Sequence, residues 1–300
     1  MIQFYVSADF DLPLPDGHRF PGQKYGMLKR YLLEHDILTP AQVLTSPRAD
    51  RDVLLTAHSV DYVDRLTDGT IDPKIMRRIG FPWSEQIPRR GERTVGGALA
   101  AACLALKHGL SGQMAGGTHH AHRDEGAGFC IYNDMAAVSL TLLNEGAVDR
   151  VAIVDLDVHQ GDGNASILAE DPRVFILDLH GAKNFPFRKV PSGYDVPLPD
   201  NMSDGDYLSV LDEHLPAVWA FAPDLVLYQA GVDSLFSDRL GRLDLSFDGL
   251  MERDRMVLEG CRQRGIPCSM AIGGGYAEPI EDTVLAYANT YRVAKSIYGF

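Results

Sequence analysis

Acidic residues and a histidine are clustered where one of the most apolar segments of the chain ends. The segment VAIVDLDVHQGDG (151–163) begins as an apolar run and then places four polar side chains within eight residues: Asp155, Asp157, His159 and Asp162. Side chains two apart in a strand project to the same side, so Asp157 and His159 could bind one metal ion together. A divalent cation would keep buried carboxylates ionised, which is otherwise costly. The alternative is a turn or capping cluster, because Asp and Gly also populate strand ends.

Two adjacent histidines follow a glycine pair in the segment GGTHHAH (116–122). His119 and His120 could be metal ligands, acid–base groups or a polar pair satisfied within the fold. Histidine is the side chain that titrates nearest to neutral pH, so an acid–base role for this pair is as plausible as a structural one.

Two further segments supply groups from more distant parts of the chain. In QAGVDS, Asp233 follows a predicted strand. Together with the Asp and His of the first cluster it would form an Asp–His–Asp set, which leaves a zinc ion one open position for water or substrate. In GGGY, three glycines allow a tight turn that presents Tyr276. A tyrosine there is either a packed aromatic or a hydrogen-bond donor to a developing oxyanion.

Each of these clusters follows a candidate strand. Apolar segments predict strands at 2–7, 113–117, 151–157, 174–179, 224–231 and 268–275, and helical patterns lie near 22–34, 92–108, 133–146, 206–221, 247–264 and 279–297. Strands that are apolar on both faces and alternate with helices predict a parallel sheet covered on both sides. Ligands bind beyond the carboxyl ends of such strands, so we expect the clusters to converge at one edge of the sheet.

The length and composition are typical of a globular protein. The 300 residues are 45% hydrophobic and 23% charged, and they contain no repeat or linker, which predicts a single α/β domain over 1–300. The chain has no apolar run of about 18 residues and no signal-like start. We therefore expect a cytoplasmic protein without a membrane partner.

The charge and the cysteines narrow the function further. A formal net charge of −13 argues against nucleic-acid binding, because no basic excess is present to contact phosphates. The negative net charge is consistent either with a contribution to solubility alone or with an electrostatic field that attracts cationic substrates. The four cysteines have no CxxC spacing, which predicts reduced thiols.

The motifs together resemble those of a known enzyme family. GGTHHAH, GFC, VDLDVHQGDG, QAGVDS and GGGY occur in the order and approximate spacing of the zinc-dependent histone deacetylases. Four more segments look like bacterial members grouped with class IV: HRFPGQKYGMLKRYLL, RIGFPWS, HGAKNFPF and DRLGRLDLS. The resemblance implies an arginase/deacetylase-like α/β fold, with a central, mostly parallel sheet of about eight strands and helices on both faces.

The resemblance also implies a metal site and a base. Asp157, His159 and Asp233 would bind one zinc ion. His119 and His120 would be the paired catalytic histidines, with His120 favoured as the general base.

Three more residues receive catalytic roles from the resemblance. Asp155 and Asp162 would orient His119 and His120 respectively. Tyr276 would donate a hydrogen bond to the carbonyl oxygen of the substrate. Class IV relatives often carry Asn where this chain has Asp162, so this position resembles the other deacetylase classes.

Residues of the substrate pocket and a second cation are implied less directly. Gly128 and Phe129 match the consecutive glycine and phenylalanine that line the acyl-lysine tunnel in the family. Phe185 or Phe187 would form the opposite wall, and Leu240 lies where the residues that line the pocket vary within the family. Outside the resemblance, a phenylalanine in such a loop is an ordinary packing residue. The family also holds potassium near zinc, through the residues around Asp155 to His159 and the segment 178–179. The remaining histidines are expected to be structural or exposed: His18, His35, His58, His108, His122, His180 and His214.

The predicted function is a zinc-dependent amidohydrolase that removes acetyl or longer acyl groups from lysine side chains, in peptides or proteins, or from related amines. Alternatives are an acetylpolyamine or small-molecule deacetylase, a ureohydrolase-like enzyme with two manganese ions, and an inactive acyl-lysine binder. Ureohydrolase chemistry needs additional aspartates, whereas GVDSLFSD offers only Asp233 at the matching place. An inactive binder usually loses a ligand or the tyrosine, and here every expected position is filled.

Overall fold

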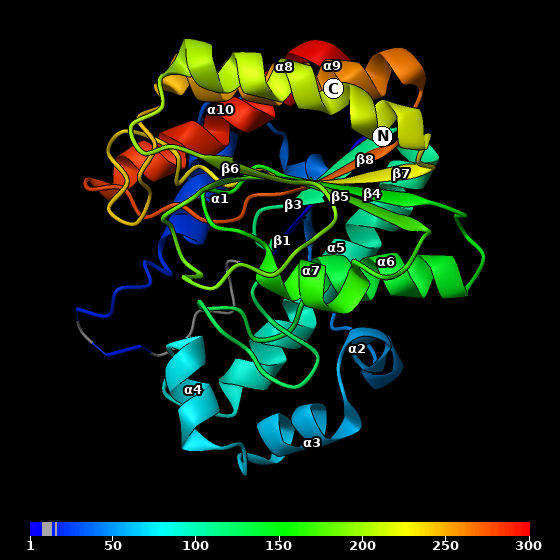
Figure 1. Cartoon of the computed structure of the whole chain (residues 1–300), viewed down its shortest axis with the longest axis vertical. Coiled ribbons are helices and arrows are strands. Elements are labelled where there is room, and N and C mark those ends of the chain that lie inside the picture. Colours follow the sequence, from blue (N-terminus) through cyan, green and yellow to red (C-terminus); the bar gives the residue numbers. More distant parts are fainter. Residues whose placement is uncertain (8–13, 16) are drawn as a thin grey trace.

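A parallel β-sheet forms the centre of the molecule, and helices pack on both of its faces (Figure 1). The computed structural model describes residues 1–7, 14–15 and 17–300. The eight strands lie in the order β2-β1-β3-β8-β7-β4-β5-β6, and every pairing is parallel. The strands are β1 (Phe4–Val6), β2 (Val43–Thr45), β3 (Leu110–Gln113), β4 (Val151–Asp155), β5 (Val174–Gly181), β6 (Asp195–Leu198), β7 (Leu225–Gln229) and β8 (Cys268–Ala271). The predicted parallel sheet is confirmed.

The helices form two layers and an additional group. Helices α8, α9 and α10 lie on one face of the sheet, and α5, α6 and α7 lie on the other, from which α2, α3 and α4 extend away (Figure 1). Their bounds are α1 (Lys24–Glu34), α2 (Arg51–Ala57), α3 (Val60–Asp68), α4 (Pro73–Ile79), α5 (Gln86–His108), α6 (Asp134–Asn144), α7 (Asp162–Leu168), α8 (Asp204–Phe221), α9 (Phe247–Arg264) and α10 (Ile280–Tyr298), with a 3₁₀ turn at Pro40–Gln42. Among the described residues, no helix is both long and apolar enough to cross a membrane.

The central strand β4 shows why the sheet forms here. All five of its residues are buried, so both of its faces pack against apolar side chains. Burial of each large aliphatic side chain contributes about 1.5–3 kcal/mol, which favours placing this segment at the centre. At its carboxyl end, Asp155 lies opposite Asp178 of β5 and Gln229 of β7. The polar ends of neighbouring strands are therefore in register.

The sequence-based element predictions were wrong in several places. The strands β2 and β6 were missed because they are short sheet edges without a continuous apolar run. The helices α2, α3, α4 and α7 were missed because each has only seven to nine residues. The strand expected at 113–117 lies earlier, at β3. Gly116 and Gly117 have φ angles of +82° and +73°, which turn the chain out of the sheet.

Candidate active site

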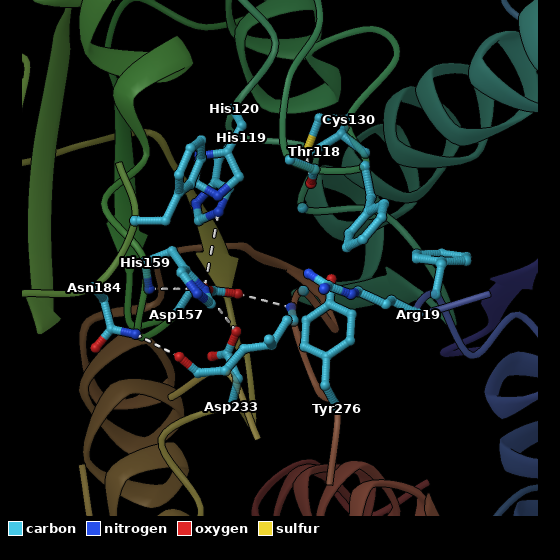
Figure 2. A pocket seen from close by; sticks show the side chains of 18 of the residues that line it. Arg19, Thr118, His119, His120, Cys130, Asp157, His159, Asn184, Asp233 and Tyr276 are labelled. Atoms are coloured by element: carbon cyan, nitrogen blue, oxygen red, sulfur yellow. Dashed lines mark hydrogen bonds and ion pairs between the residues drawn. The ribbon is translucent and has the colours of Figure 1, made fainter. Parts of the chain in front are cut away.

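The polar clusters meet beyond the carboxyl ends of β3, β4, β7 and β8, as the parallel topology requires (Figure 2). A cavity of about 610 Å³ opens there. Its lining includes six of the side chains singled out in the sequence: His119, His120, Asp157, His159, Asp233 and Tyr276. Groups that are more than 150 positions apart in the chain therefore face one space.

Three buried side chains form a candidate metal site on the floor of the cavity. The Nδ1 atom of His159 lies 3.1 Å from Asp157 Oδ1 and 3.0 Å from Asp233 Oδ2. These three residues each offer one ligand atom within 4.8 Å of the others. Burial and the neighbouring charge of Asp157 raise the pKa of Asp233 to about 7. Two carboxylates this close are disfavoured as anions without a shared cation.

The surroundings of the two carboxylates fit a divalent metal ion such as zinc. Asp157 Oδ2 accepts a hydrogen bond from the Gly274 amide at 2.7 Å, and Asp233 Oδ1 accepts one from the Val158 amide at 2.9 Å. Each carboxylate thus keeps its other oxygen directed at His159. A side chain at Gly274 would overlap the Asp233 carboxylate, so the glycine keeps this space open. The donor set of two carboxylate oxygens and one imidazole nitrogen matches zinc chemistry.

The two adjacent histidines are each held by an aspartate. His119 Nδ1 lies 2.8 Å from Asp155 Oδ2, and His120 Nδ1 lies 2.7 Å from Asp162 Oδ1. An ionised carboxylate accepts a hydrogen bond from Nδ1–H and keeps the proton on that nitrogen, which leaves Nε2 of each ring as the atom available to a ligand. The two rings are 4.1 Å apart between centroids, and His119 Nε2 is 3.9 Å from Asp157 Oδ1.

The environments of the two histidines shift their pKa values in opposite directions. Burial lowers the pKa of His119, but the carboxylates of Asp155 and Asp157 outweigh it and raise the pKa to about 10. Burial and the charge on His119 lower the pKa of His120 to about 4. Proton binding is therefore favoured at His119 and disfavoured at His120. Opposite shifts of this kind separate an acid or electrostatic role from a basic one.

His122 is a residue that the sequence analysis assigned to the structural or exposed group, and the structure places it next to the catalytic candidates. Its Nε2 atom lies 3.1 Å from the second oxygen of Asp162, and its Nδ1 lies 2.7 Å from Ser166 Oγ. The hydrogen bond to Asp162 raises the pKa of His122. Its side chain is 26% exposed. A chain of contacts therefore runs from His120 through Asp162 to solvent.

The loop that carries the histidines is fixed by the start of α6. The buried Asp134 accepts hydrogen bonds from the amides of Gly117 and Thr118, at 2.9 and 2.8 Å. Asn133 caps the helix by accepting from the Ala136 amide, and its Nδ2 donates to the Ala121 carbonyl at 3.0 Å. The sequence analysis missed both residues, although an Asn–Asp pair before an apolar helical pattern is a helix-start signal.

The same loop depends on a neutral histidine, and this predicts how stability varies with pH. His58 Nε2 accepts a hydrogen bond from the Asn133 amide at 2.8 Å, while its Nδ1 lies 2.9 Å from the His122 carbonyl. Burial lowers the pKa of His58 from 6.5 to about 4, so the unfolded chain binds more protons between these values. From pH 7 to pH 5 this site is expected to reduce the free energy of unfolding by about 2 kcal/mol.

Urea denaturation of wild type and a His58→Gln variant at pH 7 and pH 5 checks this expectation. The variant should lose about 2 kcal/mol less than wild type over this interval, because it has no proton to take up at this position. His108→Gln, at an exposed position at the end of α5, should keep the wild-type dependence. Identical pH dependence of wild type and His58→Gln would contradict the assignment.

Tyr276 is presented to the cavity by backbone and side-chain contacts. Its amide donates to the half-buried Asp238, and burial raises the pKa of the Tyr276 hydroxyl well above the ordinary value, so the hydroxyl stays protonated. Beneath its ring, Lys24 Nζ lies 4.7 Å from the ring centroid and donates to the Gly275 carbonyl at 3.0 Å and to Tyr287 Oη at 3.1 Å. Lys24 and Asp238 were missed in the sequence, where neither stands in a conspicuous cluster.

Comparison with known proteins agrees with this geometry. The family model described as the histone deacetylase domain matches residues 18–291. The chain belongs to the histone deacetylase family. Histone deacetylase 2 of Arabidopsis thaliana is 32% identical over 86% of this chain and 70% of its own length. The acetoin utilization protein AcuC of Staphylococcus aureus is 31% identical over 79% and 67%, respectively.

Two further comparisons cover nearly the full length of this histone deacetylase family member. An uncharacterised protein of Picosynechococcus sp. is 44% identical over 97% of both chains. The crystal structure of the HDA15 HD domain superposes with a TM-score of 0.80 over 99% of this chain and 95% of that chain. At 18% sequence identity, this match shows that the fold is shared.

In this family member, the tunnel candidates Gly128 and Phe129 line the cavity next to the histidines. Both have positive φ angles, +53° and +66°. A side chain at Gly128 would overlap the His120 ring, which explains the glycine. Phe129 adopts a conformation that is costly for a non-glycine residue, and such strain is concentrated at functional sites.

The opposite wall contains the other candidates. Phe185 packs edge-to-face on His120 with 4.9 Å between centroids. Phe187 is 87% exposed and Leu240 is 39% exposed, so both reach the cavity from its open side. The Leu240 carbonyl accepts a hydrogen bond from the buried Asn184 side chain at 2.7 Å. Of the two phenylalanines, Phe185 is therefore the one that packs on His120.

A second group of possible ligands lies beside the first but is satisfied by the protein. It consists of Asp178, His180 and Asp195. The Asp178 carboxylate accepts from the Gly161 amide at 2.8 Å and lies 2.7 Å from His180 Nδ1. Asp195 accepts from Gln160. The potassium ion implied by the resemblance stays a prediction.

Proposed function

We propose that the chain is a zinc-dependent deacylase that hydrolyses the amide of an acylated lysine side chain or a related acylated amine. The observation that carries the proposal is the arrangement at the floor of the cavity. There, three buried ligand atoms, an Asp-held histidine pair and a protonated tyrosine face one space. Membership of the histone deacetylase family supports a hydrolase of this type.

Asp157, His159 and Asp233 would hold the zinc ion. When bound, zinc supplies a Lewis acid that polarises an amide carbonyl and lowers the pKa of water. The protein keeps the ligand atoms in place through the amides of Gly274 and Val158, which bond the outer oxygens of the two aspartates. The metal site is thereby ordered before a substrate arrives.

His120 is the general base in this proposal. Asp162 holds the proton on Nδ1, so Nε2 is free to accept a proton from the attacking water. The same atom then returns the proton to the leaving amine. His119, held by Asp155, lines the same space beside His120. Tyr276 donates its hydroxyl proton in a hydrogen bond to the carbonyl oxygen as that oxygen becomes negative.

Asp162→Asn tests the orientation of the base. The expected result is a decrease of about 10- to 100-fold in kcat, with one zinc ion per chain retained, because an amide no longer fixes the proton on His120 Nδ1. Activity assays combined with metal analysis measure both quantities. Asp212→Asn, an exposed substitution on α8, should leave both unchanged. Loss of zinc in Asp162→Asn would place Asp162 in the metal site instead.

The experiment that tests the function compares acyl groups from acetyl to myristoyl on one lysine peptide and one polyamine. Zinc-loaded protein should release the acyl group, chelation should stop the reaction, and added zinc should restore it. The series also shows which acyl length and which amine are preferred. Absence of turnover on every lysine, polyamine and small amide substrate would refute the proposal. Two manganese ions per chain would favour a ureohydrolase, and binding of an acylated peptide without turnover would favour an inactive binder.

A further inference from the structure

The mouth of the cavity is surrounded by cations, although the chain has a formal net charge of −13. Five exposed basic residues contribute to its lining: Arg19, Arg78, Lys183, Arg239 and Arg242. Within the described part of the chain, the carboxylates in the lining are Asp157 and Asp233, and both are buried at the floor. The sign of the charge at the mouth is therefore opposite to that of the whole chain.

Three of these cations, Arg19, Lys183 and Arg242, have one carboxylate partner between them among the described residues. Lys183 and Arg242 share a single carboxylate, Asp200, at 3.2 and 3.4 Å. Arg19 has no ion-pair partner among the described residues. Figure 2 shows its side chain extending into the pocket toward Tyr276. Lys183 and Arg242 therefore offer two positive charges against one negative charge, and Arg19 adds a third positive charge from another part of the lining.

The other two cations form exposed pairs that can rearrange. Arg78 pairs with Glu125, and Arg239 lies 3.4 Å from Glu278. Exposed ion pairs contribute only about 0–1 kcal/mol, so an incoming anionic group can compete for these arginines. Among the described residues, the ion pairs of these five cations involve three carboxylates, Glu125, Asp200 and Glu278, so the cations outnumber their paired carboxylates by two.

The segments that carry the cations are anchored to the catalytic walls. Around Arg19, the preceding His18 bonds the Gly80 carbonyl at 2.9 Å, and the following Phe20 packs on Phe129 with 5.3 Å between centroids.

The turn between Arg239 and Arg242 is fixed in a similar way. The half-buried Asp238 accepts hydrogen bonds from the amides of Leu240 and Gly241 at 2.8 and 3.0 Å. The Asn184 side chain, next to Lys183, donates to the Leu240 carbonyl at 2.7 Å. Because their backbones are held, the cations remain at the mouth in the absence of a ligand.

We propose that this cationic rim selects acylated amines whose amine half carries a carboxylate, and disfavours lysine-rich peptides and polyamines. The proposal rests on the proposed deacylase function. Guanidinium groups bind carboxylates in a bidentate manner, and a cation-lined cavity concentrates anionic ligands. Screening limits the reach of more distant surface charge to about 10 Å at 0.1 M salt, so the local excess determines which substrate is attracted.

The test uses acetyl-lysine peptides that differ only in the two residues flanking the lysine on each side. The expected order of kcat/KM is Glu-flanked, then Gln-flanked, then Lys-flanked, with at least about a tenfold span at low ionic strength that shrinks at 1 M salt. Free Nε-acetyl-lysine and its carboxamide form a second pair. A preference for Nε-acetyl-lysine over its carboxamide, without a preference among the peptides, would show that the rim recognises the α-carboxylate of a small molecule. A preference among the peptides would show that it recognises acidic side chains.

Variants connect the preference to the rim. Arg19→Glu combined with Lys183→Glu should reverse the order of the Glu- and Lys-flanked peptides. Lys107→Glu is the control for charge reversal of a single residue, to be compared with Arg19→Glu and Lys183→Glu made separately, because it lies at the exposed end of α5, next to the start of β3 and away from the carboxyl edge of the sheet. It should leave the order unchanged.

The outcomes separate this inference from the function on which it rests. Equal kcat/KM on all three peptides together with no preference for free Nε-acetyl-lysine over its carboxamide, or a preference for the Lys-flanked peptide, would overturn the cationic-rim proposal and leave the deacylase intact. If none of the peptides is turned over, the deacylase proposal fails. In that case fluorescence anisotropy of the labelled peptides decides the rim proposal. Tighter binding of the Glu-flanked peptide supports it, and equal or weaker binding refutes it.

Discussion

Replacing Asp233 by alanine is expected to remove the metal and to lower deacylation by more than about 10³-fold. The site has three protein donor atoms, and the substitution removes one of the two carboxylates. It also leaves the buried Val158 amide without its acceptor, at a cost of about 1–3 kcal/mol in stability. Metal analysis, activity and thermal unfolding should be measured together.

A second variant separates metal loss from misfolding. Asp233→Asn keeps an oxygen that can accept from the Val158 amide, so it should unfold near the wild-type temperature while binding zinc poorly and showing little activity. Asp212→Asn serves again as the exposed control. If Asp233→Asn retained one tightly bound zinc and near-normal turnover, Asp233 would not be a ligand.

Removal of the Tyr276 hydroxyl is expected to lower kcat by about 10²–10³-fold while zinc stays bound. In Tyr276→Phe the ring is retained, so its contacts with Phe129 and Lys24 are kept. Only the donor to the developing oxyanion is lost. An interaction that forms mainly in the transition state affects kcat and kcat/KM equally, so KM should stay close to wild type.

Steady-state kinetics and zinc content of Tyr276→Phe check this prediction. Tyr31→Phe, on the outer helix α1, removes a hydroxyl away from the cavity and should behave like wild type. A decrease of less than about threefold in kcat of Tyr276→Phe would show that the hydroxyl does not act in the reaction. A rise in KM at constant kcat would instead indicate a role in substrate binding.

Most of the site candidates were accessible from the sequence because their positions follow from strand geometry. Asp157 and His159 are two residues apart after a buried strand, and Asp233 follows another strand of the same parallel sheet. The carboxyl ends of parallel strands lie on one edge, so these groups had to be near one another. The pairs His119–Asp155 and His120–Asp162 were implied by the family resemblance, and the distances agree with them.

Residues without a local signal were found only in the structure. Lys24 lies at the start of an ordinary amphipathic helix, yet it is fully buried beneath the GGGY segment, 251 positions away along the chain. His122 was one histidine among several until the fold placed it against Asp162. The short strands β2 and β6 depend on neighbours in the sheet rather than on their own apolar pattern.

The sequence by itself determined the parallel sheet, the edge at which the candidate site residues gather and the residue types found there. These properties follow from local periodicity and from the direction of the chain. Tertiary structure alone decided which phenylalanine contacts His120 and which sign of charge surrounds the cavity. Net charge is a sum over all residues, whereas a substrate responds to charges within about one Debye length. A chain with a net charge of −13 can therefore present a cationic mouth.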